Sequence, residues 1–306
     1  MASDNLFGAP MHGWFYLVRR FQRFLADLDL TDPQVKDGWR KQAGVRATLN
    51  RHYWSSSSET DNGFVSGSWG KTLQVRPPRD VDLLFFLPLG VHARFEQRVG
   101  NRQSQLLQEV KTVLEQTYSE TDMRGDGQAV VVRFASTPVE VIPAFPLNDG
   151  RYLICGTENG GRYILTAPHA EIAELDASDT LNRGATRRLI LMAKQWQRHC
   201  EVPIKSFQVE RIAIEFLAGW PHSRDLFWID WMVRDFFGYL ASRAGGVVVM
   251  PATGTVVPLG DAWAAKARTA YAEAARAFDY EWTNEDVLAG MSWQLIFGEM
   301  IPGWVN

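Results

Sequence analysis

The amino-acid sequence predicts an α/β (α+β) fold, with a small mixed sheet and its helices first and a helical lobe after it. The stretch 81–87 is a nearly continuous apolar run, which is typical of a strand buried on both faces. Two further strand signals, 129–135 and 139–142, flank a short turn and predict a hairpin. After about residue 175 the composition shifts, and apolar residues recur at the spacing of buried helix stripes.

Length and composition are those of a soluble globular protein. A chain of 306 residues can form two domains with a sizeable core, and we expect them over residues 1–175 and 176–306. Hydrophobic residues make up 46% and charged residues 22%, which are ordinary proportions. The sequence has no apolar run of membrane-spanning length, and residues 1–10 lack a signal-peptide pattern. We therefore expect a cytoplasmic protein without a membrane partner.

Cysteine usage and charge exclude several other classes. The two cysteines, Cys155 and Cys200, give neither a disulfide framework nor a zinc-binding spacing, and the six histidines are scattered. A net charge of −3 argues against extended binding of a nucleic-acid backbone, which requires a basic face. We expect no stable nucleic-acid partner.

The N-terminal part should begin with two helices. Apolar spacing predicts a helix over 12–30, and Asp32 as N-cap, with Pro33 at the first helical position, starts a second helix that ends near Tyr53. A polar linker follows at 55–62. The further elements expected here are a helix within 93–118, a turn at 122–127 and a strand–loop–strand unit at 152–163.

The C-terminal part should be helical. The expected helices are one opened by residues 179–185 and running to 200, and those at 208–220, 229–244 and 261–278. The alanine-rich body of the last of these suits close helix packing. A short, mostly apolar tail is expected at 295–306.

Asp80 and Asp82 stand at the entrance of the 81–87 strand. Side chains alternate along a strand, so both carboxylates lie on the same face. Two such charges repel each other, and burying either is costly unless a cation compensates. Mg²⁺, which takes carboxylate and phosphate oxygens, is the simplest compensation. An isolated pair of this kind would more often cap the solvent end of a strand, but the glycine–serine turn upstream favours the metal-site interpretation.

That turn has the composition of a phosphate-binding segment. Gly67 allows a tight turn and a close approach to a ligand, while Ser68, Lys71 and Thr72 offer hydroxyl and ammonium donors. The segment looks like the end of a Walker A motif, but that motif would need glycine at the position of Val65.

Gly67-Ser68, Thr72 and Asp80-Val81-Asp82 together resemble the motif of the DNA polymerase β-like nucleotidyltransferase superfamily. Within it, the chain most resembles the bacterial cyclic GMP-AMP synthase-like enzymes (CD-NTases), which make cyclic oligonucleotide signals for antiphage defence in CBASS operons. The resemblance implies a third metal-binding carboxylate on a neighbouring strand. Glu140 matches it, with Glu where many relatives carry Asp.

The resemblance also implies how the site is organised. It implies a polymerase β-like core, a C-terminal helical lobe and an active site in the cleft between them. Segments 194–196 and 204–210 are similar to a two-helix signature in which a lysine and a serine hold the donor triphosphate. The implied catalytic and metal-binding residues are Asp80, Asp82 and Glu140, with two Mg²⁺ ions for which Mn²⁺ can substitute. The implied nucleotide-binding residues are Gly67, Ser68, Thr72, Lys194 and Ser206.

The activity implied is the synthesis of a cyclic di- or trinucleotide, for example cyclic GMP-AMP, from nucleoside triphosphates such as ATP and GTP. A separate effector protein would read the product, and CBASS accessory proteins are further implied partners. Two alternatives stay open. One is a nucleotidyltransferase that modifies a protein, an RNA end or a small molecule; the other is a non-catalytic nucleotide-binding module.

Overall fold

The computed structural model describes residues 12–222 and 228–305, which divide into two compact units. We call residues 30–174 with 250–255 the sheet unit, and the described residues of 1–29, 175–249 and 256–306 the helical unit. By its contacts the first helix, expected in the N-terminal domain, groups with the C-terminal helices. Within the described ranges, none of the helices combines the length and apolar character needed to cross a membrane.

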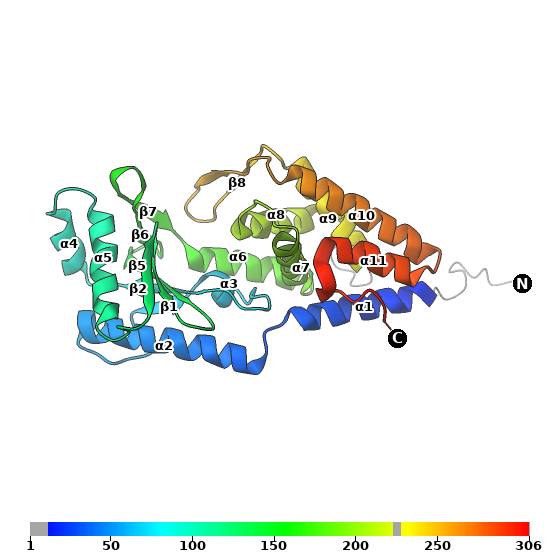
Figure 1. Cartoon of the computed structure of the whole chain (residues 1–306). Helices are drawn as coiled ribbons and strands as arrows, with labels where there is room; N and C mark the ends of the chain where they lie inside the picture. Colours follow the sequence, from blue (N-terminus) through cyan, green and yellow to red (C-terminus); the bar gives the residue numbers. More distant parts are fainter. Residues whose placement is uncertain (1–11, 223–227, 306) are drawn as a thin grey trace, which may run out of the picture. The chain divides into compact units, whose positions relative to one another are not determined.

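A mixed sheet forms the centre of the sheet unit (Figure 1). Its strand order is β1-β2-β5-β4-β3, and β6 and β7 continue from β5. The pairing of β2 with β5 is parallel, and the other pairings are antiparallel. The strands are β1 (Gly63–Val65), β2 (Val81–Phe86), β3 (Asp122–Asp126), β4 (Ala129–Arg133), β5 (Val139–Pro146), β6 (Tyr152–Gly156) and β7 (Arg162–Thr166).

Both faces of β2 are covered, as its apolar run predicted. Leu83 and Phe85 belong to a large core with residues of α2 and α5, whereas Leu84 packs with Tyr152 and Ile154 in a smaller cluster. Side chains alternate along the strand, so Asp82 shares the face of Leu84. The helices of this unit are α2 (Asp32–Trp54), α3 (Gly67–Gly70), α4 (Leu89–Glu96), α5 (Arg102–Glu115) and the first part of α6 (Pro168–Leu181), with a 3₁₀ turn at Glu158–Gly160.

The helical unit is built around aromatic side chains. Trp196, Trp293 and Phe297 are completely or almost completely buried in it. Five alanines of α10 are buried and let neighbouring helices approach closely: Ala264, Ala267, Ala270, Ala274 and Ala277. The elements are α1 (His12–Leu28), the end of α6, α7 (Ala185–His199), α8 (Ser206–Gly219), α9 (Ile229–Ser242), β8 (Val247–Val249), β9 (Val256–Pro258), α10 (Ala264–Trp282), α11 (Asp286–Phe297) and a 3₁₀ turn at Gly298–Met300.

The structure confirms the predicted α/β class and the 129–142 hairpin, and it corrects several elements. Thr31, not Asp32, is the N-cap of α2, and its backbone N–H donates to Gln34 Oε1 at 2.9 Å. The helix expected within 93–118 is confirmed as α5, and a separate helix, α4, precedes it, because Gly100 has a positive φ and the Asn101 side chain caps the start of α5. The expected turn at 122–127 is wrong: it is strand β3, paired with β4.

Candidate active site

The register between β2 and β5 brings the acidic residues together. Asp82 lies directly opposite Glu140 in the parallel pair, and Asp80 immediately precedes β2. Each of the three offers a carboxylate oxygen, and these oxygens all lie within 4.8 Å of one another. The three side chains are half-buried, so the cluster is open to a ligand while its backbone is fixed by the sheet.

The turn before β2 packs directly against this cluster, through Gly67 and Asp82. Gly67 has φ +55°, and a Cβ placed on it would lie 1.7 Å from Asp82 Oδ2. The preceding residue is held as well, because the Ser66 N–H donates to the Asp82 carbonyl oxygen at 2.8 Å. Only glycine fits here, since any other side chain would collide with a carboxylate and would also adopt a disfavoured backbone conformation.

Helix α3 begins at this glycine and is anchored by Trp69. That side chain is buried and fills the space over Gly38 of α2, where a Cβ would lie 2.3 Å from the indole ring. Ser68, beside Gly67, is half-buried, and its carbonyl oxygen accepts from the Leu73 N–H at 2.8 Å. Thr72 is exposed at the end of the turn with φ +55°. The structure therefore places Ser68 next to the residue that contacts Asp82, and Thr72 at the exposed end of the same turn.

Lys71 has a partner that the sequence analysis missed. Its Nζ lies 2.7 Å from Glu171 Oε2, and the two side chains are only 9% and 18% exposed. Glu171 belongs to α6, a helix that was not predicted. A Cβ on Gly70 would lie 2.4 Å from the Val65 carbonyl oxygen. The ion pair and this close contact fix the turn to its neighbours, so Lys71 serves the architecture of the turn.

The donor set of the carboxylate cluster fits Mg²⁺. Carboxylate oxygens are the ligands this ion prefers, and three negative charges so close together require a cation to be stable as a group. The largest separation of these oxygens, within 4.8 Å, is close to the roughly 4.2 Å between opposite ligands of one Mg²⁺ ion. Among the described residues, the group of three or more His, Cys, Asp or Glu side chains close enough to hold one metal ion consists of Asp80, Asp82 and Glu140.

Lys194 and Ser206 both lie where α7 packs on α8 in the helical unit. Lys194 Nζ is 3.2 Å from Glu210 Oε1, with side-chain exposures of 13% and 9%. Ser206 is the first residue of α8, and its hydroxyl donates to Gln197 Oε1 at 3.0 Å. Because Ser206 and Glu210 are one turn apart on α8, the two predicted residues share one helix–helix contact. Their role toward a triphosphate stays a prediction.

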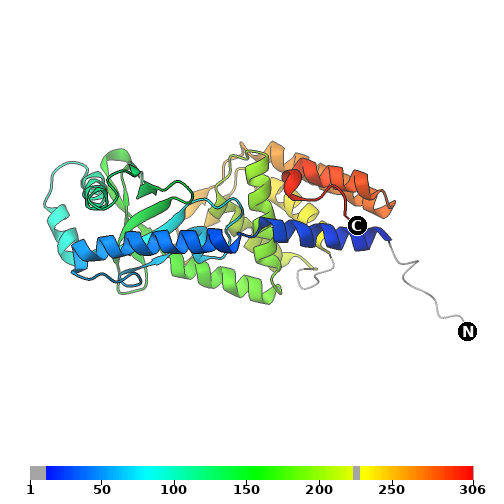
Figure 2. The ribbon, with the colours of Figure 1, turned by 60° about the horizontal axis from the view of Figure 1, so that its bottom comes forward.

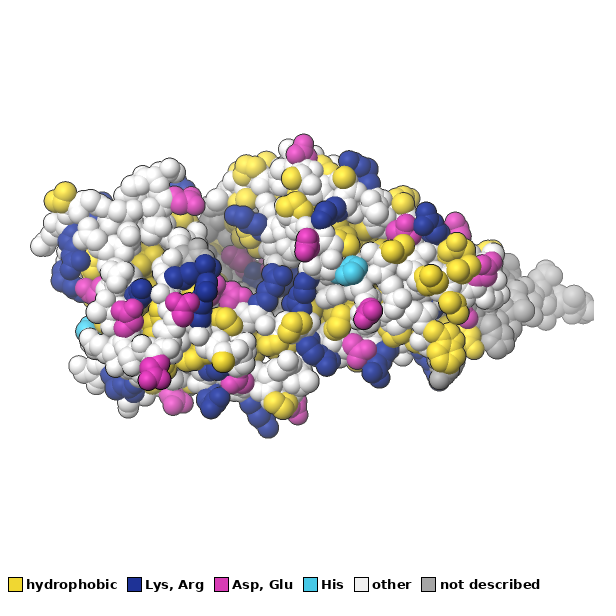
Figure 3. Space-filling view, in the orientation of Figure 1, with side chains coloured by type: hydrophobic (Ala, Val, Ile, Leu, Met, Phe, Trp, Pro, Cys, Tyr) yellow, Lys and Arg dark blue, Asp and Glu magenta, His cyan; other side chains and the backbone are white. Residues whose placement is uncertain are grey.

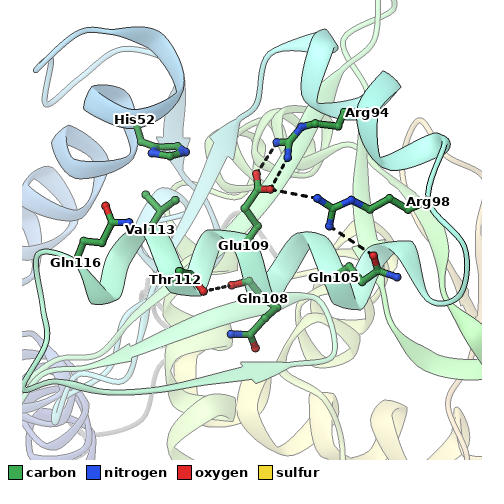
Figure 4. A pocket seen from close by; sticks show the side chains of 9 residues that line it. All are labelled: His52, Arg94, Arg98, Gln105, Gln108, Glu109, Thr112, Val113 and Gln116. Carbon is green, nitrogen blue, oxygen red and sulfur yellow. Dashed lines mark hydrogen bonds and ion pairs between the residues drawn. The ribbon is translucent and has the colours of Figure 1, made fainter.

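A separate hollow of about 490 Å³ opens on the sheet unit over α2, α4 and α5 (Figure 4). Glu109 lies at its centre and accepts two hydrogen bonds from Arg94, at 2.6 and 2.7 Å. Burial opposes ionisation of this carboxyl, but the bonds from Arg94 hold the pKa of Glu109 below its ordinary value. The lining residues are His52, Arg94, Arg98, Gln105, Gln108, Glu109, Thr112, Val113 and Gln116, which include no residue of the carboxylate cluster.

Comparison with known proteins agrees with the family resemblance seen in the sequence. A model of the Second Messenger Oligonucleotide or Dinucleotide Synthetase domain matches residues 16–179, a range that contains the carboxylate cluster. Comparison with curated proteins gives no match.

Solved structures extend the likeness over both units. CdnC of Escherichia coli MS115-1, solved with ATP, is 21% identical with a TM-score of 0.66, and the match covers 92% of this chain and 98% of that one. The Vibrio cholerae cyclic AMP-GMP synthase DncV, solved with nonhydrolyzable GTP, is 13% identical with a TM-score of 0.71 and 97% coverage of each chain. The Bradyrhizobium diazoefficiens CD-NTase CdnG, solved with GTP, is 12% identical with a TM-score of 0.66, covering 96% and 97%. At these identities the likeness establishes the fold, that of DncV-like nucleotidyltransferases.

Proposed function

The chain belongs to the family of second messenger oligonucleotide or dinucleotide synthetases, and from this premise we propose that it makes a cyclic di- or trinucleotide from nucleoside triphosphates, for example cyclic GMP-AMP from ATP and GTP. Pyrophosphate is the leaving group. The observation that carries the proposal is the cluster of Asp80, Asp82 and Glu140, on which Gly67 is directly seated. Members of this family are nucleotidyltransferases, and a polymerase β-like fold surrounds the cluster.

In this proposal Asp80, Asp82 and Glu140 would hold two Mg²⁺ ions, for which Mn²⁺ could substitute. Such ions, when bound, neutralise the triphosphate and stabilise the charge that develops on the attacking and leaving oxygens. The three carboxylates fix where the α-phosphate lies, because their backbone positions are set by the sheet. Glu140 also accepts the proton of the acceptor hydroxyl, which attacks the α-phosphate in line.

The remaining site residues position the donor nucleotide. Ser68 and Thr72 present hydroxyls from the turn that begins at Gly67. Lys194 and Ser206 bind the β- and γ-phosphates, and the place of Ser206 at the first position of α8 supports this, since helix N-termini favour phosphate. Much of the rate enhancement is then positional. A second transfer within the linear intermediate closes the ring.

The biological setting proposed is antiphage signalling in the bacterial cytoplasm. The product would be read by a separate effector protein, and accessory proteins of a CBASS operon would be further partners. The family membership supports a signalling role. Among the structural neighbours, E. coli CdnC was solved as a complex with a HORMA protein, which makes a protein partner of that kind reasonable here.

The first test is a product assay with Asp82→Asn. Incubation of the wild-type chain with all four nucleoside triphosphates and Mg²⁺ or Mn²⁺ should yield a cyclic product identifiable by mass spectrometry. Asp82→Asn should yield none, because a metal ligand is lost, while its melting temperature stays unchanged or rises through relief of like-charge repulsion. Glu120→Gln, an exposed carboxylate of the same unit, is the control and should keep full activity.

Three outcomes would contradict the proposal. Near-normal turnover of Asp82→Asn at saturating Mg²⁺ would exclude the metal-binding role of the cluster. Nucleotide transferred only to an added protein, RNA or small molecule would favour a modifying nucleotidyltransferase. Binding of triphosphates without any turnover would favour a non-catalytic module, although all three carboxylates are present.

Activity should not depend on nucleic acid. Two basic residues of α2 are engaged within the sheet unit, since Lys41 pairs with Asp37 at 2.7 Å and Arg46 is buried. Lys36, Arg40 and Arg51 are exposed, but three cations are a small basic surface for a phosphate backbone on a chain whose net charge is −3. Nuclease-treated enzyme should form product equally with and without duplex DNA or RNA across a salt range. A strict requirement for duplex that weakens with salt would contradict this expectation.

A further inference from the structure

Helix α11 is apolar on both of its sides. One side is buried in the helical unit through Ala289, Trp293 and Phe297. The opposite side is exposed and is apolar as well, at Val287 (54%), Leu288 (39%), Met291 (55%) and Leu295 (60%). A surface helix normally turns polar residues outward, so packing inside the helical unit does not explain these four side chains.

Neighbouring elements extend this exposed apolar side into one surface. Positions 287, 288, 291 and 295 lie on one face of α11 by helical spacing. Trp282, 69% exposed, ends α10, which lies beside α11 in both ribbon views (Figures 1 and 2). We call the exposed side chains of Trp282, Val287, Leu288, Met291, Leu295 and Trp304 the α11 face.

The C-terminal segment is held against the same helix. A Cβ on Gly290 would lie 1.8 Å from the Gly303 carbonyl oxygen, and Gln294 Nε2 donates to the Ile301 carbonyl oxygen at 3.1 Å. Trp304, 61% exposed, directly follows this contact. Figure 3 shows hydrophobic side chains gathered over this end of the helical unit, with acidic and basic side chains around them. Exposed apolar patches of this kind mark interaction surfaces.

The charges around the α11 face indicate which kind of partner it can bind. From Ala277 to Asn306 the sequence contains no Lys, Arg or His, and the preceding Arg276 is paired with Glu273 at 2.9 Å. Of the five carboxylates in this range, Asp279, Glu285 and Glu299 are exposed, whereas Glu281 is buried. A second copy docking through the same face would bring like charges together, and an anionic membrane surface would be repelled.

We propose that the α11 face is the docking surface for a partner protein that presents an apolar segment flanked by Lys or Arg. Trp282 and Trp304 are the anchors, since exposed Trp side chains contribute most to such interfaces. The carboxylates around them set the register and exclude acidic partners. The surface lies outside residues 16–179 and includes none of the residues proposed for catalysis, so this inference does not depend on the proposed function.

The test uses two short fluorescein-labelled peptides that form amphipathic helices, identical in their Leu and Trp residues. One carries Lys at both ends and the other carries Glu. Fluorescence anisotropy with the full chain should show the Lys peptide binding at least about tenfold more tightly than the Glu peptide, and salt should weaken it. The double variant Met291→Glu/Leu295→Glu should lose the binding. Val99→Glu, which alters a 93% exposed apolar residue of the sheet unit, should keep it.

Several results would overturn the proposal. One is equal binding of both peptides, or binding of neither up to about 1 mM. Because this comparison uses the wild-type chain, it stands even if the double variant fails to fold. A dimer in light scattering that the double variant abolishes would assign the face to a second copy. Binding to phosphatidylcholine–phosphatidylglycerol vesicles, lost in the same variant, would assign it to a membrane.

Discussion

At the residue scale, the contact between Gly67 and Asp82 constrains the carboxylate cluster most closely. The sequence suggested a tight turn at Gly67 and a metal site at Asp80, Asp82 and Glu140, and the structure brings the three carboxylates together. The sequence alone could not show that the turn touches Asp82, because that contact depends on how the chain folds back from the turn onto β2. The 2.7 Å pair of Lys71 with Glu171 was hidden for the same reason, since its partners are 100 positions apart.

Gly67→Ala should therefore impair the site itself. The added Cβ would overlap Asp82 Oδ2, so Asp82 or the turn must move, and we expect product formation to fall by about two orders of magnitude. The matched control is Gly127→Ala, which has a similar φ of +57° and no atom within 4 Å of the new Cβ. It should cost only the backbone strain of about 1–2 kcal/mol and keep activity. Comparable activity in the two variants would show that the Gly67 contact is unimportant.

At the element scale, sequence periodicity located the elements with a single apolar stripe and missed those without one. Helix α6 buries little beyond Leu175, and α11 is apolar on both sides, so neither shows a clear helical period. Asp179 illustrates the effect. It was expected to open a helix but lies in the last turn of α6, from where its Oδ1 accepts from the Arg187 N–H of α7 at 2.9 Å. Asp179 therefore accepts a hydrogen bond from the first turn of α7 but belongs to the preceding helix.

The contact between α7 and α8 leads to a prediction about Lys194. Lys194→Ala should raise the KM for nucleoside triphosphate by about tenfold or more if the ammonium binds phosphate. It should also lower stability, because Glu210, 9% exposed at its side chain, loses its 3.2 Å cationic partner. Glu210→Gln separates the two effects: it breaks the same ion pair but should leave KM unchanged or lower. Steady-state kinetics with thermal denaturation distinguishes them, and Lys205→Ala, an exposed residue, is the surface control.

An unchanged KM in Lys194→Ala, with the same loss of stability as in Glu210→Gln, would assign Lys194 to structure alone. A rise in KM shared by both variants would indicate a general disturbance of the α7–α8 contact. Phosphate binding by Lys194 is supported only if the KM rises in Lys194→Ala and does not rise in Glu210→Gln.

At the scale of the whole molecule, the predicted class and family agree with the structure, although the family model matches only residues 16–179. The structural neighbours continue through the helical unit because the fold there is kept while the sequence differs. What the sequence could not reveal was the contact of α1 with the C-terminal helices. Arg20 is fully buried and pairs with Glu281 at 3.3 Å, 261 positions away, on a helix face otherwise formed by apolar residues.

This buried group gives the helical unit a distinct electrostatic centre. Arg20 comes from α1, Glu281 from α10, Asp230 from α9 and Asp286 from α11. Burial raises the pKa of Glu281 to about 8 and that of Asp230 to about 6. The nearby carboxylates act in the same direction on Glu281, whereas the hydrogen bond from Trp293 and the charge of Arg20 oppose it. Between its ordinary pKa and about 8, Glu281 therefore binds its proton more tightly in the folded state than in the unfolded state.

The last prediction follows from the sign of this shift. Stability contributed by the protonated Glu281 is fully present below about pH 4.5 and is lost as the pH rises toward 8, by roughly 3–4 kcal/mol across pH 5 to 8. Glu281→Gln, which keeps an acceptor for Trp293 and Arg20, should flatten this dependence, while the smaller contribution of Asp230 below pH 6 remains. Denaturant unfolding followed by tryptophan fluorescence measures it, since nine of the twelve tryptophans belong to the helical unit. Glu299→Gln, an exposed carboxylate of the same unit, is the control. An equal slope in wild type and Glu281→Gln would mean that Arg20 already holds Glu281 ionised at pH 5.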